Sequence, residues 1–425
     1  MIKIYDYDKL SIDDIFARED EDTSSLENTV SQIIENVRKN GDAALREYAD
    51  KFDGGAPQCL EVTEEEIEDA FKTVSPELIE IMKKAAKNIE NFHKRQIRQS
   101  FIISEEDGAI CGQKIIPIEK AGLYVPGGTA AYPSSVLMNS IPAKLAGCSE
   151  IVITTPAKGG KVNPVILAAA KLGGVGRIFK TGGAQAIAAL AYGTESVPKV
   201  DKIVGPGNAF VAEAKKQVFG KVSIDMIAGP SEILVIADEK SNPSFVAADL
   251  LSQAEHDKMA SAVLVTESRE LAQKVAEELE VQIPLLERSD IARTSIDNNG
   301  KIIIVNDIET AVIAANEIAP EHLELCLDNP FDYLDKIKNA GSVFMGRYCP
   351  EALGDYFAGP NHTLPTSGTA RFSSPLSVDD FIKKTQFTYY TKDALKKVSG
   401  DIYKFAMAEG LGAHAKSAVI RGEED

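Results

Sequence analysis

The chain has 425 residues, which exceeds one ordinary domain and predicts about two or three. Its content of 44% hydrophobic and 26% charged residues is typical of a globular protein with a sizeable core. The formal net charge of −18 argues against nucleic acid or an anionic membrane as a partner, because both attract basic surfaces.

Helices are predicted for the first hundred residues. Thr63 and Glu66 have the spacing of a capping box, and Ser75 before Pro76 has the pattern of an N-cap followed by proline at the first helical position. Apolar residues then recur at helical spacing to residue 92. His93 follows in a basic segment, where a solvated helix end is the favoured interpretation over a ligand role.

From about residue 115, short apolar runs alternate with glycine-rich turns and alanine-rich helical stretches. The predicted strands span residues 150–155, 177–180, 202–204, 233–237, 261–266, 301–305 and 322–327. The predicted helices span residues 164–172, 184–191, 209–218, 243–256, 270–278 and 308–318. This alternation predicts an α/β fold with parallel sheets covered on both faces, in which ligands bind beyond the carboxyl ends of strands.

The end of the chain has a different pattern. After about Ser374 the strand rhythm is lost, and residues 379–384, 392–397 and 402–409 are predicted to be helical. Because this tail is too small to bury a core of its own, we expect it to pack on the main body or on a neighbouring subunit.

Three glycine-rich segments are candidates for binding an anionic cofactor. They are residues 122–128, 181–185 and 204–208, and they contain Tyr124, Gln185 and Asn208. Glycine lets a ligand approach the backbone, and a helix that begins after the turn directs N–H groups at an anion. No G-x-G-x-x-G fingerprint is present, so ordinary turns between strands and helices remain an alternative to a nucleotide site.

Cysteine usage and the N-terminus predict a cytoplasmic protein. The five cysteines are scattered without a C-x-x-C pair, which suits a reducing compartment. The first residues lack the pattern of a signal peptide, and no apolar run reaches the ~20 residues of a membrane span.

Four of the five histidines lie in the second half of the chain near carboxylates. Gln253 and His256 are three residues apart on a predicted helix, whereas Asp355 and His362 share a loop rich in glycine and proline. These side chains, with His362 or His414 as a second imidazole, would suit zinc, manganese or cobalt. Each pair could instead be structural.

Two further pairs could carry acid–base chemistry. Glu321 and His322 begin a predicted strand, where both side chains can line one cavity although neighbours within a strand point to opposite faces. Glu409 and His414 are separated by a flexible glycine segment. For both pairs an ordinary strand start or helix end is the alternative to a site.

Taken together, these motifs resemble those of the L-histidinol dehydrogenase family over essentially the whole chain. The segments that carry the resemblance are residues 122–128, 181–185, 205–208, 225–231, 253–257, 319–323, 354–365 and 409–414.

The resemblance implies a homodimer that oxidises L-histidinol to L-histidine with NAD as hydride acceptor and one zinc per subunit. By similarity, zinc would be bound by Gln253, His256, Asp355 and His414, and the same four residues would also contact the substrate. His414 would come from the partner subunit. Glu321 and His322 would be the acid–base pair, with His322 also at the substrate. Ser231, His362 and Glu409 would contact the substrate, and Tyr124, Gln185 and Asn208 would contact NAD.

The resemblance also implies two incomplete Rossmann-like domains. We expect an N-terminal arm over residues 1–22 and one Rossmann-like domain, with the zinc and acid–base residues, over 23–123 plus 233–374. The second, which contacts NAD, would span 124–232. A C-terminal helical tail, residues 375–425, would dock on the partner subunit.

Two functions of other classes remain open. A zinc hydrolase in which Glu321 activates water would explain the histidines but not the glycine turns. A metabolite-binding protein without catalytic activity could use the same fold.

Overall fold

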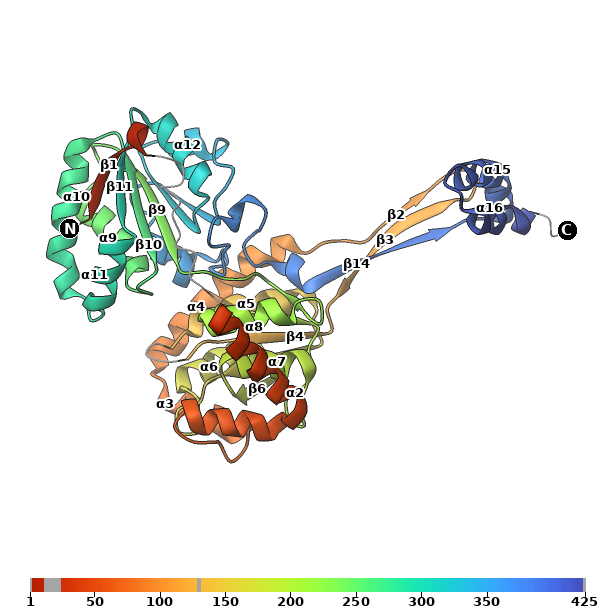
Figure 1. The fold of residues 1–425 in the computed structure, drawn as a ribbon, viewed down its shortest axis with the longest axis horizontal. Helices are drawn as coiled ribbons and strands as arrows, with labels where there is room; N and C mark the ends of the chain where they lie inside the picture. The colour runs from red at the N-terminus through yellow and green to blue at the C-terminus, as the bar shows by residue number, and fades with distance from the viewer. Residues whose placement is uncertain (1, 11–23, 128–130, 423–425) are drawn as a thin grey trace. The chain divides into compact units, whose positions relative to one another are not determined.

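The computed structural model describes residues 2–10, 24–127 and 131–422, and these divide into two compact units. The core unit comprises residues 1–96 and 118–381, and the tail unit comprises residues 97–117 and 382–425 (Figure 1). Most of the predicted N-terminal arm, residues 11–22, lies outside the described residues. Its described part includes a strand, β1 (Lys3–Asp6), which pairs with a strand near residue 301.

The first sheet of the core unit has six parallel strands in the order β1-β11-β10-β9-β12-β13. Its other strands are β9 (Glu232–Ala237), β10 (Ser261–Thr266), β11 (Lys301–Ile304), β12 (His322–Cys326) and β13 (Ser342–Met345). Alternate residues of β9 point to opposite faces, so that Val235 packs in one cluster and Leu234 in another. Helices therefore cover both faces.

Three helices cover one face of this sheet and α12 (Ile308–Ile318) covers the other (Figure 1). The three are α9 (Pro243–Ala254), α10 (Arg269–Gln282) and α11 (Ser289–Asn298). Two short helices, α13 (Phe331–Leu334) and α14 (Glu351–Leu353), follow β12 and β13. A π-helical turn, Gly354–Ala358, continues directly from α14.

The second sheet of the core unit has five parallel strands in the order β6-β5-β4-β7-β8. They are β4 (Lys120–Tyr124), β5 (Glu150–Thr155), β6 (Arg177–Lys180), β7 (Lys202–Val204) and β8 (Ser223–Ile224). The helices that connect them are α5 (Pro133–Ala146), α6 (Pro164–Gly173), α7 (Gly183–Tyr192) and α8 (Ala209–Val218). Two parallel sheets with helical layers confirm the predicted α/β class.

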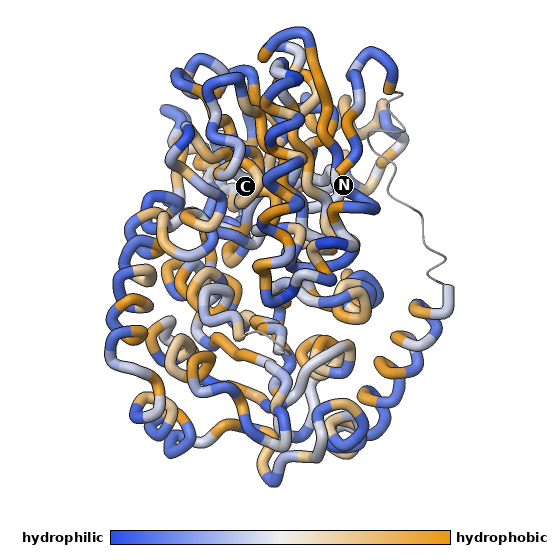
Figure 2. Tube along the Cα trace, turned by 90° about the vertical axis from the view of Figure 1, so that its left-hand side faces the viewer, coloured by the Kyte–Doolittle hydropathy of each residue, from blue (hydrophilic) through white to orange (hydrophobic). Residues whose placement is uncertain are grey.

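The N-terminal helices pack on the five-stranded sheet. This differs from the expected domain in which residues 23–123 join residues 233–374, because residues 233–374 contain the strands of the other sheet. Helix α2 (Ser24–Phe52) shares a core with α7 and α8, and helices α3 (Glu64–Thr73) and α4 (Pro76–His93) share one with α5 and α6. The reason is their apolar faces. In Figure 2 the helix that follows the grey trace, α2, alternates hydrophobic and hydrophilic turns, and its Val30, Ile33 and Val37 are buried.

The predicted helix starts are confirmed. The Thr63 side chain accepts from the backbone N–H of Glu66, and the Glu66 carboxylate accepts from Thr63 N, which completes the capping box of α3. Ser75 caps α4 with Pro76 at its first position. The expectation for His93 is wrong, because this side chain is buried rather than solvated, with Nδ1 2.7 Å from Gln96 Oε1.

The tail unit contains a three-stranded antiparallel sheet in the order β14-β3-β2 and two helices. The elements are β2 (Phe101–Ser104), β3 (Ile110–Pro117), β14 (Ile382–Tyr389), α15 (Lys392–Ala408) and α16 (Gly412–Val419). The prediction of a helix over residues 379–384 is therefore wrong, since residues 382–389 form a strand that pairs with β3 over eight residues. The predicted helices at 392–397 and 402–409 form one helix, α15.

Several short segments complete the described structure. The 3-10 helical turns are Tyr7–Lys9, Lys94–Gln96, Ile283–Leu285, Thr369–Arg371, Val378–Phe381 and Ile420–Gly422. All five cysteines have free thiols. Within the described ranges, no helix is both long enough and apolar enough to cross a membrane.

Candidate active site

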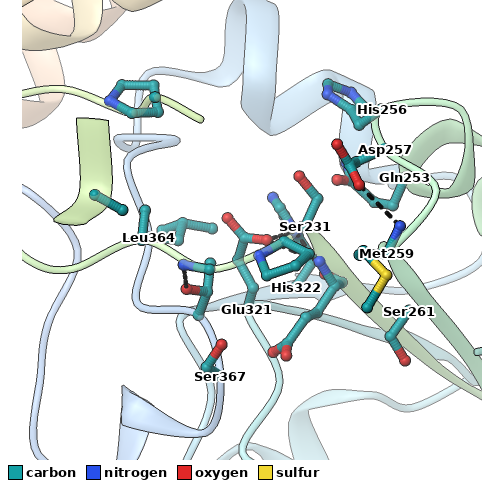
Figure 3. A pocket seen from close by; sticks show the side chains of 18 of the residues that line it. Ser231, Gln253, His256, Asp257, Met259, Ser261, Glu321, His322, Leu364 and Ser367 are labelled. Carbon is teal, nitrogen blue, oxygen red and sulfur yellow. Dashed lines mark hydrogen bonds and ion pairs between the residues drawn. The ribbon is translucent and has the colours of Figure 1, made fainter. Parts of the chain in front are cut away.

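A cavity of about 1610 Å³ lies within the core unit and joins elements of both parallel sheets. From the five-stranded sheet it is lined by Gly127 after β4 and by residues 205–208 after β7. From the six-stranded sheet it is lined by residues at the amino ends of β9 and β12 and by the end of α9. Figure 3 shows Ser231, Glu321 and His322 in this cavity, with Gln253 and His256 beside them.

The glycine turn after β7 lies at the point where the order of the five-stranded sheet reverses. Strands β4 and β7 are neighbours there but are separated in sequence by β5 and β6, which creates a crevice beyond their carboxyl ends. Gly205 has φ +118°, and a Cβ on it would lie 2.1 Å from Tyr124 O. Only glycine fits this close approach, which explains one of the glycines that the sequence singled out.

The three residues expected at NAD occupy different positions. Asn208 is exposed in the cavity wall, where its Oδ1 accepts from Val211 N (3.2 Å) and caps α8. Tyr124 and Gln185 are buried, and neither belongs to the described residues that line the cavity. The hydroxyl of Tyr124 accepts from Gly183 N (3.1 Å), and burial raises its pKa to about 12. The structure therefore brings only Asn208 of these three into the cavity wall.

Glu321 and His322 line the same cavity at the amino end of β12, as the sequence allowed. Both are held by Glu232, the first residue of β9, whose N–H donates to Glu321 Oε2 (2.9 Å). The carbonyl of Glu232 lies 2.9 Å from His322 Nδ1. A carbonyl can only accept, so Nδ1 carries a proton, whereas the buried Nε2 has no hydrogen-bond partner among the described residues.

The charges of this pair are strongly coupled. Burial raises the pKa of Glu321 to about 8. Burial alone would lower the pKa of His322, but the nearby carboxylates of Glu321 and Asp355 raise it to about 10. His322 Nδ1 lies 3.6 Å from Glu321 Oε2, and Nε2 lies 3.6 Å from Asp355 Oδ1. These groups can therefore exchange protons with one another and with a bound molecule.

Asp355 and His362 are brought together by the loop after α14. His362 Nδ1 donates to the backbone oxygen of Asp355 (3.1 Å), and Nε2 lies 3.1 Å from Ser135 Oγ. Burial lowers the pKa of His362. Because protein groups engage both of its ring nitrogens, His362 is less suited to be a metal ligand than Asp355, whose carboxylate lines the cavity.

Gln253 and His256 also line the cavity, although not on one helix as predicted. Helix α9 ends at Ala254, so that His256 lies in the following turn, where its N–H donates to Gln253 O (3.1 Å). Gln253 is 2% exposed, and burial lowers the pKa of His256. Gln253 and His256 therefore line the same cavity wall because of this turn, and not because of helical spacing.

Glu409 and His414 belong to the tail unit. Glu409 is the C-cap of α15, and His414 lies in the first turn of α16. Both side chains are exposed.

The sequence profile of the family described as "Histidinol dehydrogenase" matches residues 16–422. The chain belongs to the histidinol dehydrogenase family. It is 56% identical over 405 residues to the histidinol dehydrogenase of Clostridium acetobutylicum, with 95% of this chain and 94% of that protein covered. A histidinol dehydrogenase of Bacillus cereus is 56% identical over 401 residues, with 94% of each chain covered.

A crystal structure of histidinol dehydrogenase from Elizabethkingia anophelis agrees with the fold. Its TM-score is 0.94 at 42% sequence identity, with 99% of this chain and 98% of that chain covered. As a member of the histidinol dehydrogenase family, the protein is an oxidoreductase, and the family implies oxidation of histidinol in histidine biosynthesis.

In this member of the family, the structure adds carboxylates that were not predicted from the sequence. Ligand atoms of His322, Glu351 and Asp355 all lie within 4.8 Å of one another. The Glu351 N–H donates to Glu324 Oε1 (2.7 Å), and Ser252 Oγ donates to Glu351 Oε2 (2.6 Å). Simple spacing could have found two of them, since Glu351 precedes Asp355 by four and Glu324 follows His322 by two on the same strand face.

Proposed function

We propose that the protein oxidises L-histidinol to L-histidine in two consecutive NAD-linked steps, through L-histidinaldehyde that stays bound. The observation that carries this proposal is the single cavity that contains both the glycine turn beside β4 and β7 and the Glu321–His322 pair. An acid–base pair next to a crevice suited to a dinucleotide favours proton removal coupled to hydride transfer.

His322 is proposed to take the proton of the substrate alcohol, and of the aldehyde hydrate in the second step. Its Nδ1 is committed to the carbonyl of Glu232, which leaves Nε2 as the accepting atom. A cation held by Asp355 would offset the carboxylate charge that raises the pKa of His322, so that the imidazole could accept a proton near neutral pH.

Glu321 is proposed to activate the water that hydrates the aldehyde. Its raised pKa makes it a stronger base than an ordinary carboxylate, and the N–H of Glu232 fixes one of its oxygens. Ser231 and His362, which line the same cavity, would orient the substrate.

The donor set on the cavity wall fits a zinc ion. Gln253, His256 and Asp355 supply an amide oxygen, an imidazole and a carboxylate, which are ligands that zinc accepts, although the amide is an uncommon one. Bound zinc would orient the substrate and polarise its oxygen. NAD, which is proposed to bind at Asn208, Tyr124 and Gln185, would supply the hydride acceptor.

The fourth zinc ligand is proposed to be His414 of the partner subunit, with Glu409 of the partner subunit at the substrate. Both residues are exposed in the tail unit, whose exposed apolar side chains include Tyr403 and Phe405. A homodimer that covers these side chains would complete the site.

The experiment is to incubate purified protein with L-histidinol and NAD and to follow histidine by chromatography, before and after chelation. Histidine formation that stops on chelation and returns with added zinc is the expected result. Turnover that survives complete removal of metal would contradict the metal assignment, and no histidine from zinc-loaded protein would contradict the proposed reaction.

A further inference from the structure

A buried ion pair lies directly behind the glycine turn that lines the cavity. Lys215 Nζ, on α8, contacts Asp225 Oδ1, and the two side chains are only 2% and 1% exposed. Removing two charges from water is costly, and apolar side chains of similar volume often give equal or greater stability. The pair therefore calls for an explanation other than stability.

The polar groups of Gly205 supply that explanation. Its N–H donates to Asp225 Oδ2 (2.8 Å), and its carbonyl accepts from Lys215 Nζ (3.0 Å). The β-ladder between β7 and β8 ends at Ile203 and Ile224, so that Gly205 lies beyond the sheet. The ion pair thus supplies the hydrogen bonds that a neighbouring strand would otherwise make to the N–H and the carbonyl of Gly205. Two apolar side chains could not do this.

Local geometry directs each side chain to this point. Lys215 lies seven residues after the cap Asn208, on the same face of α8, and helical side chains lean toward the N-terminus. Asp225 follows β8, where its N–H donates to Ile203 O (3.2 Å) and its Oδ1 accepts from Met226 N (2.7 Å). The Lys215 ammonium therefore contacts Gly205 O and Asp225, and the Asp225 carboxylate contacts Lys215 and the N–H groups of Gly205 and Met226.

Asp225 also begins the segment 225–231, which connects the two sheets and ends at Ser231. All seven of its residues line the cavity. Its far end is fixed as well, because Gly229 N donates to Thr366 Oγ1 (2.6 Å). The pair thus joins the glycine turn of one sheet to the segment that carries a proposed substrate contact of the other.

We propose that Lys215 and Asp225 are positioning residues that hold the Gly205–Asn208 turn in the conformation that binds NAD. This inference rests on the proposed function, because it takes NAD as the ligand of the turn. Without the pair, Gly205 loses its fixed orientation and the cavity wall at Asn208 moves, while Gln253, His256 and Glu321 on the other sheet keep their supports.

The test is the double variant Lys215→Met/Asp225→Asn, which removes both charges and leaves none unpaired. The matched control is Lys202→Met/Asp380→Asn, since Lys202 of β7 forms a partly buried ion pair (3.1 Å) with Asp380 of the turn Val378–Phe381, away from the cavity lining. We would measure the NAD dissociation constant by calorimetry, the KM values for NAD and histidinol, the zinc content and the melting temperature.

The expected result is a roughly ten- to hundredfold weaker affinity for NAD, the size of one or two charge-assisted hydrogen bonds. The KM for histidinol and the zinc content should stay unchanged, and the control should bind NAD normally. If the double variant does not fold, Lys215→Met alone should show the same selective loss, since the Asp225 carboxylate still accepts from the N–H groups of Gly205 and Met226.

Unchanged NAD affinity in the folded variant would overturn the inference. Equal losses of NAD and histidinol binding, or equal losses in the control, would also overturn it, since they would show a general loss of stability. An unaltered protein that fails to bind NAD would instead contradict the proposed function, and the inference that rests on it.

Discussion

His322 is the residue on which the proposed chemistry depends most directly. Its Nδ1 is held by a backbone carbonyl, and its Nε2 is a buried atom without a normal hydrogen bond among the described residues. That atom lies 3.6 Å from Asp355 Oδ1, which is longer than a hydrogen bond. A buried, unsatisfied nitrogen is costly in a fold and is expected where a substrate completes the contact.

His322→Ala should keep its zinc and lose at least ~100-fold in turnover, the scale of a lost general base. Zinc content by atomic absorption and kcat from NADH formation would measure both effects. A matched control is His93→Gln, which alters a buried histidine outside the cavity lining and should keep nearly normal turnover. Turnover of His322→Ala within tenfold of the unaltered protein would remove this residue from the mechanism.

His93 predicts a pH dependence of stability. Burial lowers its pKa from the usual 6.5, and Gln96 Oε1, which already accepts from Val378 N, accepts from Nδ1. Nε2 is then a buried acceptor without a partner among the described residues, and its protonation would place an unpaired charge in the interior. The unfolded chain binds this proton more readily, so that stability falls as the pH drops below about 6.5, by up to about 1.4 kcal/mol per pH unit.

Urea unfolding of the unaltered protein and of His93→Gln at several pH values between neutral and mildly acidic would isolate this contribution. The variant should lose less stability than the unaltered protein over that window. Parallel pH profiles for the two proteins would show that His93 does not titrate differently in the folded state.

At the scale of elements, three segments form a frame behind the proposed metal ligands. Helix α9 carries Ser252 next to Gln253, α14 carries Glu351 one turn before Asp355, and β12 carries Glu324 on the same face as His322. The hydrogen bonds Ser252–Glu351 (2.6 Å) and Glu351–Glu324 (2.7 Å) tie the three together. Such supporting contacts set the orientation of ligands.

Glu351→Ala should therefore weaken zinc binding by about ten- to hundredfold, the usual effect of removing such a support. Competition with a chromophoric chelator would measure the affinity without reference to activity. Ser244→Ala is the control, because Ser244 lies at the start of the same helix and bonds to Gln282 instead. Equal zinc affinities in Glu351→Ala and the control would contradict the role of the frame.

Sequence patterns located most elements of the core unit because apolar runs and helix caps are local signals. The strands at 150–155, 177–180, 202–204 and 261–266 and the helices at 209–218 and 308–318 have the predicted bounds. The strand β14 was missed, since its side chains are mostly exposed and lack the apolar run on which the prediction rested. Its partner β3 lies more than 260 residues earlier in the chain, a pairing that no local pattern contains.

The candidate site, too, could be predicted from the sequence only in part. The histidines and their neighbouring carboxylates were visible in the sequence, and the structure brings Gln253, His256, Glu321, His322 and Asp355 to one cavity. The supporting residues Glu232 and Ser252 were not visible, because their roles depend on contacts between separate elements. Asn208 and Tyr124 share the glycine-turn signal yet differ in exposure, which only packing decides.

At the scale of the whole molecule, the proposed zinc site needs residues from two subunits. His322→Ala subunits keep His414, and His414→Ala subunits keep His322. A mixed dimer would therefore contain one complete site, formed by the core unit of one subunit and the tail unit of the other. Mixing the two inactive variants under conditions of subunit exchange should restore roughly a quarter of normal activity, because about half of the dimers are mixed.

A control mixture of His322→Ala with Glu321→Ala should restore nothing, since both changes affect the same core unit surface. Sedimentation would confirm that dimers form in both mixtures. No recovery in the first mixture, with exchange demonstrated, would place His414 outside the partner's site.

The most direct test of the central claim is the yield of NADH from a limiting amount of L-histidinol with excess NAD, run to completion with zinc-loaded protein. Two NADH per histidinol, with histidine as the sole product, is the predicted result, because both oxidations are proposed to occur in the same cavity. One NADH per histidinol with free aldehyde, or no NADH at all, would contradict the account.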